Sequence, residues 1–367
     1  MVWYHGSPCE HSTLPIREMG SIVCFHIILT RFIVKENEMK PSQLRDKLLK
    51  CMKAGLPVLI KGSPGVGKSD IVAQVSDELE MDLFISHPVV SDPTDYKGLP
   101  GIVDGQAEFL PFGDLLKLIE AVKPTVAFLD DLGQAPACVQ AAAMQLLLAR
   151  RVNGHCISNK VVFVAATNRR EDRAGVTGIL EPVKSRFATI LELTPDEGEW
   201  AEWAFAHDMP GKLIAFGHFR PGLLNSFKPT SDIINSPCPR TFANAGHLIN
   251  AGIEDLETLS GAVGEGCAIE MTGFFKYWNE LPNLDALIMN PDKAEVPKEP
   301  AALYAVVTGL VEKVTKQNVG RIFKYGARLP KDFNILLGRD CLRKDKSIQH
   351  TKSFIEWTVA NKDVFTA

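Results

Sequence analysis

The feature that most constrains this chain is a glycine-rich loop at residues 62–69. The loop reads Gly-Ser-Pro-Gly-Val-Gly-Lys-Ser and fits the pattern G-x-x-x-x-G-K-[ST]. The apolar run 57–61 precedes it, and a helix is expected to follow it to about Leu79. Glycines allow such a loop to wrap around phosphates, so that backbone N–H groups and the start of the next helix face the anion. The sequence therefore predicts a phosphate-binding loop rather than an ordinary turn.

Every residue of this loop is a candidate for nucleotide binding. The eight are Gly62, Ser63, Pro64, Gly65, Val66, Gly67, Lys68 and Ser69. Lys68 would reach the β- and γ-phosphates, and the Ser69 hydroxyl would bind Mg²⁺. These residues do not determine which purine base is bound.

Four further apolar runs predict the strands of a sheet, at residues 83–85, 126–129, 161–165 and 189–193. They alternate with helical stretches, which is typical of a parallel sheet covered by helices on both faces. We therefore expect an α/β domain over residues 39–195.

Two acidic residues follow the strand at 126–129. An acid at this point supplies the carboxylate on the Mg²⁺ side of a phosphate-loop enzyme, and we assign that role to Asp130. Asp131 is then placed to polarise an attacking water as a general base. A plain strand end with a polar turn is the alternative, which the upstream phosphate loop disfavours.

Three more side chains are candidates for contact with the γ-phosphate. Asn168 follows the strand at 161–165 and could orient the water, although a turn residue is the alternative. Arg186 precedes the last strand, and Arg240 lies near the start of a helix in the second half of the chain. An arginine beside a γ-phosphate stabilises the charge that develops during transfer. Both arginines could equally be surface or salt-bridge residues.

The rest of the chain divides by texture. Residues 1–38 lack periodicity, either because Met39 is the true start or because they form an arm that binds a partner. Residues 196–281 are expected to be helical. Residues 282–300 carry four prolines and are expected to be a linker. Residues 301–367 are again expected to be helical.

Composition limits the partners and the compartment. Forty basic and 44 acidic side chains give a net charge of −4, so no global field attracts a polyanion. Few aromatic residues accompany the basic ones near the C-terminus, which argues against nucleic acid as a partner. Eight scattered cysteines without a CxxC pair fit the cytoplasm. The longest apolar segment, 21–34, is too short for a membrane span.

Five segments together resemble the AAA+ ATPases, within them the MoxR-like group and its dynein-related relatives. They are GSPGVGKS, FLDD, AATN, LEPVKSRF and SPCPRTF, and the resemblance covers about residues 41–250. It implies the AAA+ P-loop NTPase fold: a parallel sheet sandwiched by helices, then an α-helical lid at 196–281 and a helical C-terminal extension at 301–367. It also implies ATP and Mg²⁺ as cofactors.

The resemblance further assigns roles to three side chains. Asn168 would be sensor 1, Arg186 the arginine finger inserted into the neighbouring subunit's site, and Arg240 sensor 2 on the lid. Such a finger implies a ring, usually a homohexamer. The family usually has Glu where this chain has Asp131, which is one methylene shorter.

Two dipeptides predict β-hairpins. Asp104-Gly105 lies between short apolar runs, and Asn153-Gly154 precedes the strand at 161–165. By resemblance the first is an insert that faces the pore of the ring, with an ordinary surface hairpin as the alternative.

The predicted function is that of a cytoplasmic, Mg²⁺-dependent ATPase that remodels a protein client, by resemblance one with a von Willebrand factor A domain. A nucleotide-gated scaffold with little hydrolysis is one alternative. A motor subunit of a nucleic-acid-processing complex, such as a GTP-using restriction ATPase, is the other.

Overall fold

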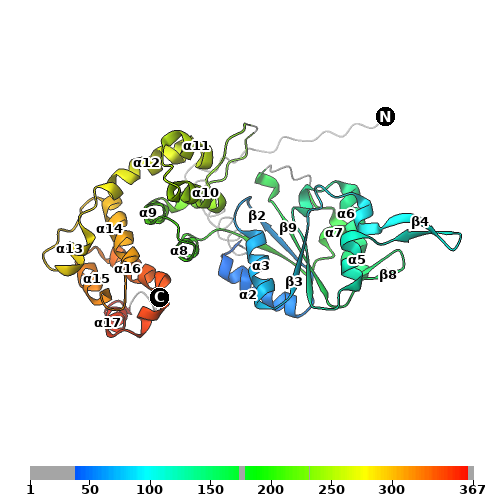
Figure 1. Ribbon diagram of the computed structural model, residues 1–367, viewed down its shortest axis with the longest axis horizontal. Coiled ribbons are helices and arrows are strands. Elements are labelled where there is room, and N and C mark those ends of the chain that lie inside the picture. The colour runs from blue at the N-terminus through cyan, green and yellow to red at the C-terminus, as the bar shows by residue number, and fades with distance from the viewer. Residues whose placement is uncertain (1–37, 173–177, 231, 363–367) are drawn as a thin grey trace, which may run out of the picture. The chain divides into compact units, whose positions relative to one another are not determined.

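The computed structural model describes residues 38–172, 178–230 and 232–362. Its main sheet has six strands in the order β1-β10-β2-β9-β6-β3 (Figure 1). The strands are β1 (Glu38–Met39), β2 (Val58–Gly62), β3 (Asp82–Ser86), β6 (Thr125–Leu129), β9 (Val161–Thr167) and β10 (Thr189–Leu193). The five strands from β10 to β3 pair in parallel. All five correspond to the apolar runs of the sequence.

Helices cover both faces of this sheet, as expected. Figure 1 shows α2 (Pro41–Lys53) and α3 (Lys68–Glu78) on one side and α5 (Gly113–Glu120) and α6 (Ala137–Ala149) on the other. Two shorter helices, α4 (Pro93–Lys97) and α7 (Glu181–Lys184), and two 3₁₀ turns, η2 (Leu132–Gln134) and η3 (Arg170–Asp172), belong to the same part. Strand β9 is buried throughout, and its side chains enter the two cores alternately.

Both predicted hairpins are present. Strands β4 (Leu99–Val103) and β5 (Gln106–Leu110) pair antiparallel around Asp104 and Gly105, which have φ of 48° and 80°. Strands β7 (Arg151–Val152) and β8 (His155–Cys156) pair around Asn153 and Gly154, at 45° and 90°. Positive φ at both central residues suits Asp-Gly and Asn-Gly, because Asn, Asp and Gly tolerate the left-handed region.

The remainder of the described chain is helical. Its elements are α8 (Glu197–Ala206), α9 (Gly211–Phe219), η4 (Pro221–Asn225), α10 (Pro239–Asn250), α11 (Leu256–Val263), α12 (Glu265–Asn279), α13 (Leu284–Met289), α14 (Pro300–Glu312), α15 (Val319–Gly326), α16 (Lys331–Lys344), η5 (Lys346–His350) and α17 (Lys352–Ala360). One hydrophobic cluster runs from Trp200 to Trp357. The segment 282–300 contains α13, and Leu287 and Ile288 of that helix are buried in this cluster. Helices of the expected lid and of the expected extension therefore share one core.

A buried ion cluster ties three of these helices together. His218 of α9 pairs through Nε2 with Asp340 Oδ2 of α16 at 2.7 Å and through Nδ1 with Glu197 of α8. Arg343 Nη1 lies 2.7 Å from the other Asp340 oxygen. Burial alone would lower the pKa of His218, but the Asp340 and Glu197 carboxylates outweigh it and raise that pKa to about 9. The imidazole is therefore a buried cation at neutral pH.

Some basic side chains of the C-terminal part form ion pairs within the chain. Lys324 lies 2.6 Å from Asp292, and Lys346 lies 3.0 Å from Glu202. No helix in residues 38–172, 178–230 and 232–362 combines the length and apolarity that crossing a membrane requires. The expectations for residues 1–37 lie outside the described residues.

Candidate nucleotide site

The glycine-rich loop lies between β2, which ends at Gly62, and α3, which begins at Lys68. Gly65 and Gly67 have φ of 73° and 92°. Residues with a Cβ rarely adopt such values, so the path of the loop requires glycine at both positions. The predicted order of strand, loop and helix is thus realised.

Lys68 is anchored in the hollow of its own loop. Its Nζ donates to the Gly62 carbonyl at 2.9 Å, the Ser63 carbonyl at 3.0 Å and Asn168 Oδ1 at 2.7 Å. The residue is 7% exposed. Burial lowers the pKa of Lys68 to about 8, although the Asp131 and Asp130 carboxylates counteract part of this effect. Three neutral acceptors therefore occupy the N–H donors that are predicted to bind phosphate oxygens.

Ser69 and Asp130, which are predicted to bind Mg²⁺, contact each other. Ser69 Oγ donates to Asp130 Oδ2 at 2.8 Å, and the other Asp130 oxygen accepts from the Asp131 backbone N–H at 3.0 Å. Among the described residues, no group of three or more His, Cys, Asp or Glu side chains could hold a metal ion by itself. One carboxylate and one hydroxyl suit Mg²⁺, which usually keeps several waters and takes further oxygens from substrate phosphates.

Asp131 is held by two amides. Its Oδ1 accepts from Gln134 Nε2 at 2.8 Å and from Asn168 Nδ2 at 3.4 Å. Its backbone lies in the left-handed region, with φ of 55°. The Asn168 amide therefore bridges Lys68, through its oxygen, and Asp131, through its nitrogen. Three predicted site residues from β9, α3 and the end of β6 are brought together by this one side chain.

The two arginines lie in different surroundings. Arg186 donates from Nη1 to Ser185 Oγ at 3.1 Å, and no hydrogen bond or ion pair joins it to the phosphate loop within the described part of the chain. Arg240 lies at the start of α10, and its backbone N–H donates to the Gly65 carbonyl at 3.1 Å. Arg240 is thus brought to the loop, whereas Arg186 is not.

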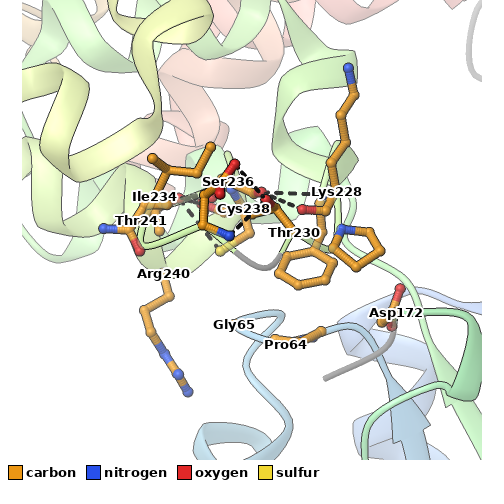
Figure 2. Close-up of a pocket in the computed structure, with 14 residues that line it drawn as sticks. Pro64, Gly65, Asp172, Lys228, Thr230, Ile234, Ser236, Cys238, Arg240 and Thr241 are labelled. Carbon is orange, nitrogen blue, oxygen red and sulfur yellow. Dashed lines mark hydrogen bonds between the residues drawn. The ribbon is translucent and has the colours of Figure 1, made fainter. Parts of the chain in front are cut away.

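A cavity of about 580 Å³ opens beside the loop (Figure 2). Pro64, Gly65 and Asp172 line it from the α/β side, and Ser236 and Arg240 belong to its helical wall. Its volume lies within the range of small-molecule sites. Figure 2 shows the Arg240 side chain extending along the loop from the helical wall.

Cys238 was not among the predicted residues, yet its side chain packs against the phosphate loop. A Cβ added at Gly65 would lie 2.6 Å from Cys238 Sγ, so the thiol packs directly on the loop. Gln134 and Arg169 were also missed. Gln134 lies three residues after Asp131, and Arg169 follows Asn168 directly, so proximity to predicted site residues was the available signal.

The match to known families covers the centre of the chain. Residues 57–187 match the family described as "AAA domain (dynein-related subfamily)". These residues are thus similar to the AAA domains of that subfamily. The matched range includes the phosphate loop, Asp130, Asp131, Asn168 and Arg186, whereas Arg240 lies beyond it. No curated protein matches the chain.

Several solved structures resemble the chain at low sequence identity. A mutant of RuvB from Thermotoga maritima is 16% identical, with 74% of this chain and 82% of that chain covered and a TM-score of 0.40. NtrX from Brucella abortus, in complex with ADP, is 12% identical, with 89% and 67% covered and a TM-score of 0.35. The ligands and activities of those proteins are properties of those proteins and are not assigned to this chain.

Proposed function

We propose that this protein is an ATPase of MoxR type that uses Mg²⁺ and couples ATP hydrolysis to the remodelling of a protein client. One observation carries the proposal: Asn168 links the phosphate-loop amine of Lys68 to the carboxylate of Asp131 at 2.7 and 3.4 Å. The Asn168 amide thereby contacts both the cation proposed for the phosphates, Lys68, and the base proposed for water, Asp131. The AAA domain match supports the same chemistry.

Each residue has a definite task in this mechanism. Lys68 exchanges the Gly62 and Ser63 carbonyls for phosphate oxygens, because a charged acceptor forms the stronger hydrogen bond. Asp131 takes a proton from the attacking water, and Asn168 fixes the direction of that carboxylate. Ser69 and Asp130 would hold Mg²⁺, which neutralises charge on the phosphates.

The proposal extends to a ring, and the placement of the arginines supports it. Arg240 lies against the phosphate loop of its own chain, where it would act as sensor 2. Arg186 would complete the site of the neighbouring subunit in a homohexamer. A single chain then holds every part of the site except the finger.

The client would contact the β4–β5 hairpin. Its apolar side chains are exposed on the described surface, including Ile102 at 81% and Leu99 at 48%. Exposed apolar side chains gathered on one hairpin suit contact with an unfolded or apolar segment of a protein. By resemblance, the client or its adaptor carries a von Willebrand factor A domain.

A nucleotide-gated scaffold is the second candidate, and Asp131 is the observation that favours it. This carboxylate is short and already accepts two amide hydrogen bonds through Oδ1. Because Asp is one methylene shorter than Glu, the attacking water must come closer to this carboxylate. Such a ring would bind ATP and assemble, but would turn over slowly.

Phosphate release separates the two candidates. We expect Mg²⁺- and ATP-dependent phosphate release from the full chain and a fall of about 10- to 100-fold or more in Lys68→Ala, which loses a charged hydrogen-bond donor to phosphate. Lys117→Ala is the matched control, since that lysine is exposed and pairs with Asp114 on α5. ATP binding without phosphate release in the unaltered chain would instead establish the scaffold.

A further inference from the structure

Arg169 follows Asn168 at the end of β9, and its guanidinium reaches the phosphate loop. Nη2 contacts Ser63 Oγ, and Ser63 is 3% exposed. The same group forms a two-pronged pair with Asp172, with Nε to Oδ2 and Nη2 to Oδ1 both at 3.0 Å. Asp172 is 4% exposed. The fork of Arg169 therefore joins one hydroxyl of the loop to one buried carboxylate, which lies in the wall of the cavity (Figure 2).

A second ion pair lies behind this fork. Arg169 Nη1 lies 4.0 Å from Glu192 Oε1, and Glu192 Oε2 lies 3.0 Å from Lys61 Nζ. Lys61 and Glu192 are direct neighbours in the register of β2 and β10. Arg169 thus spans the carboxyl ends of three adjacent strands, β10, β2 and β9. In an open parallel sheet, this is the edge where ligands bind.

The Ser63 contact gains importance once nucleotide is bound. Lys68 Nζ now holds the Gly62 and Ser63 carbonyls, and it must release them to reach phosphate oxygens. The contact between Arg169 and the Ser63 hydroxyl does not involve Lys68, so that exchange does not require it to break. It can hold the start of the loop against the strand that ends in Asn168.

We propose that Arg169 is a positioning residue that fixes the Ser63 end of the phosphate loop relative to Asn168 while nucleotide is bound. The proposal rests on nucleotide binding at this loop, as proposed above. Its geometry requires a fork rather than a point charge, because one guanidinium must serve Asp172 and Ser63 together. Lysine in its place would keep the charge but not both contacts.

The test must separate positioning from folding. Removing the charge of Arg169 would leave Asp172 buried and unpaired, which by itself destabilises the domain. Arg169→Lys keeps the charge, and Ser63→Ala removes only the hydroxyl and leaves the Asp172 pair intact. Arg45→Gln is the control, since Arg45 and its partner Glu78 are each about two-fifths exposed, on α2 and α3.

The experiment measures binding of a non-hydrolysable ATP analogue with Mg²⁺ to the full chain, without turnover. We expect Ser63→Ala and Arg169→Lys each to weaken binding about 3- to 10-fold, as the net contribution of one ordinary hydrogen bond implies. The double variant should bind the analogue no more weakly than the more weakly binding of the two single variants, because both changes break the same contact between Arg169 and Ser63. Arg45→Gln should bind normally, and the thermal midpoint of Ser63→Ala should stay near that of the unaltered chain.

Two results would overturn the proposal: normal binding by Ser63→Ala, or losses that multiply in the double variant. Phosphate release by the unaltered chain tests the proposed function separately. If the unaltered chain binds the analogue but releases no phosphate, hydrolysis is refuted and the binding cycle still decides the role of Arg169. If the unaltered chain does not bind the analogue, both proposals are refuted.

Discussion

Nucleotide affinity should fall steeply with pH, because the key cation of the phosphate loop is buried. Burial lowers the pKa of Lys68 to about 8 in the free protein, and phosphate oxygens would raise it again on binding. ATP therefore binds best to the protonated amine. Above the free pKa, each pH unit removes about 1.4 kcal/mol of binding free energy, as proton linkage requires.

The expected size follows from that value. Between about pH 7 and about pH 9.5, the protonated fraction of Lys68 falls about 30-fold for a pKa of about 8, or about 2 kcal/mol. The dissociation constant of a non-hydrolysable ATP analogue with Mg²⁺ should rise by that factor, provided that the bound amine stays protonated. Isothermal titration calorimetry at a series of pH values measures it directly. Proton uptake on binding should peak near the upper end of the range.

Lys68→Arg is the matched variant, because arginine stays protonated throughout this range. It should bind more weakly at neutral pH, since the loop is shaped around an amine, but with little dependence on pH. A flat affinity profile for the unaltered chain would refute the reasoning. Equal slopes for the two proteins would assign the pH dependence to another group.

Three further predictions concern the ring, the client and the helical core. Asp131→Asn and Arg186→Ala should each abolish most ATP hydrolysis. Mixing the two variants should restore part of it, because some sites then combine an intact Asp131 with an intact Arg186 from the neighbouring subunit. If mixed rings form without any recovery of hydrolysis, Arg186 does not act on the neighbouring site. Ile102→Ser changes a side chain of the β4–β5 hairpin that is 81% exposed. It should leave basal phosphate release intact and weaken the stimulation of that release by a client. Loss of basal release would instead show that the hairpin is part of the ATPase core. The pKa of His218 is raised to about 9 from an ordinary 6.5, so its protonation contributes up to about 3 kcal/mol to the free energy of unfolding. This contribution is complete below about pH 6.5 and is lost as pH rises through about 9. Urea unfolding across this range should show the loss of stability, and His218→Gln should make the stability less dependent on pH.

Local chemistry made much of the fold predictable. The apolar runs became β2, β3, β6, β9 and β10. The reason is clearest for β6 and β9, which are buried throughout, because strands buried on both faces need continuous apolar sequence. The turns at 104–105 and 153–154 formed because their residues tolerate positive φ. Residues 282–300 were different: their prolines indicated a linker, but they contain α13, which packs on α14 and α15 and buries Leu287 and Ile288 in the helical core.

The sequence by itself determined the parts of the site, and the tertiary structure decided how they meet. A phosphate loop is a local property, since its glycines and lysine act within eight residues. The hydrogen bond from Lys68 to Asn168 joins residues 100 positions apart, and the contact of Arg169 with Ser63 spans 106. Spacing cannot select such partners, because many side chains could reach the same edge of the sheet. Only the strand order, which places β9 beside β2, sets which of them lie within hydrogen-bonding distance.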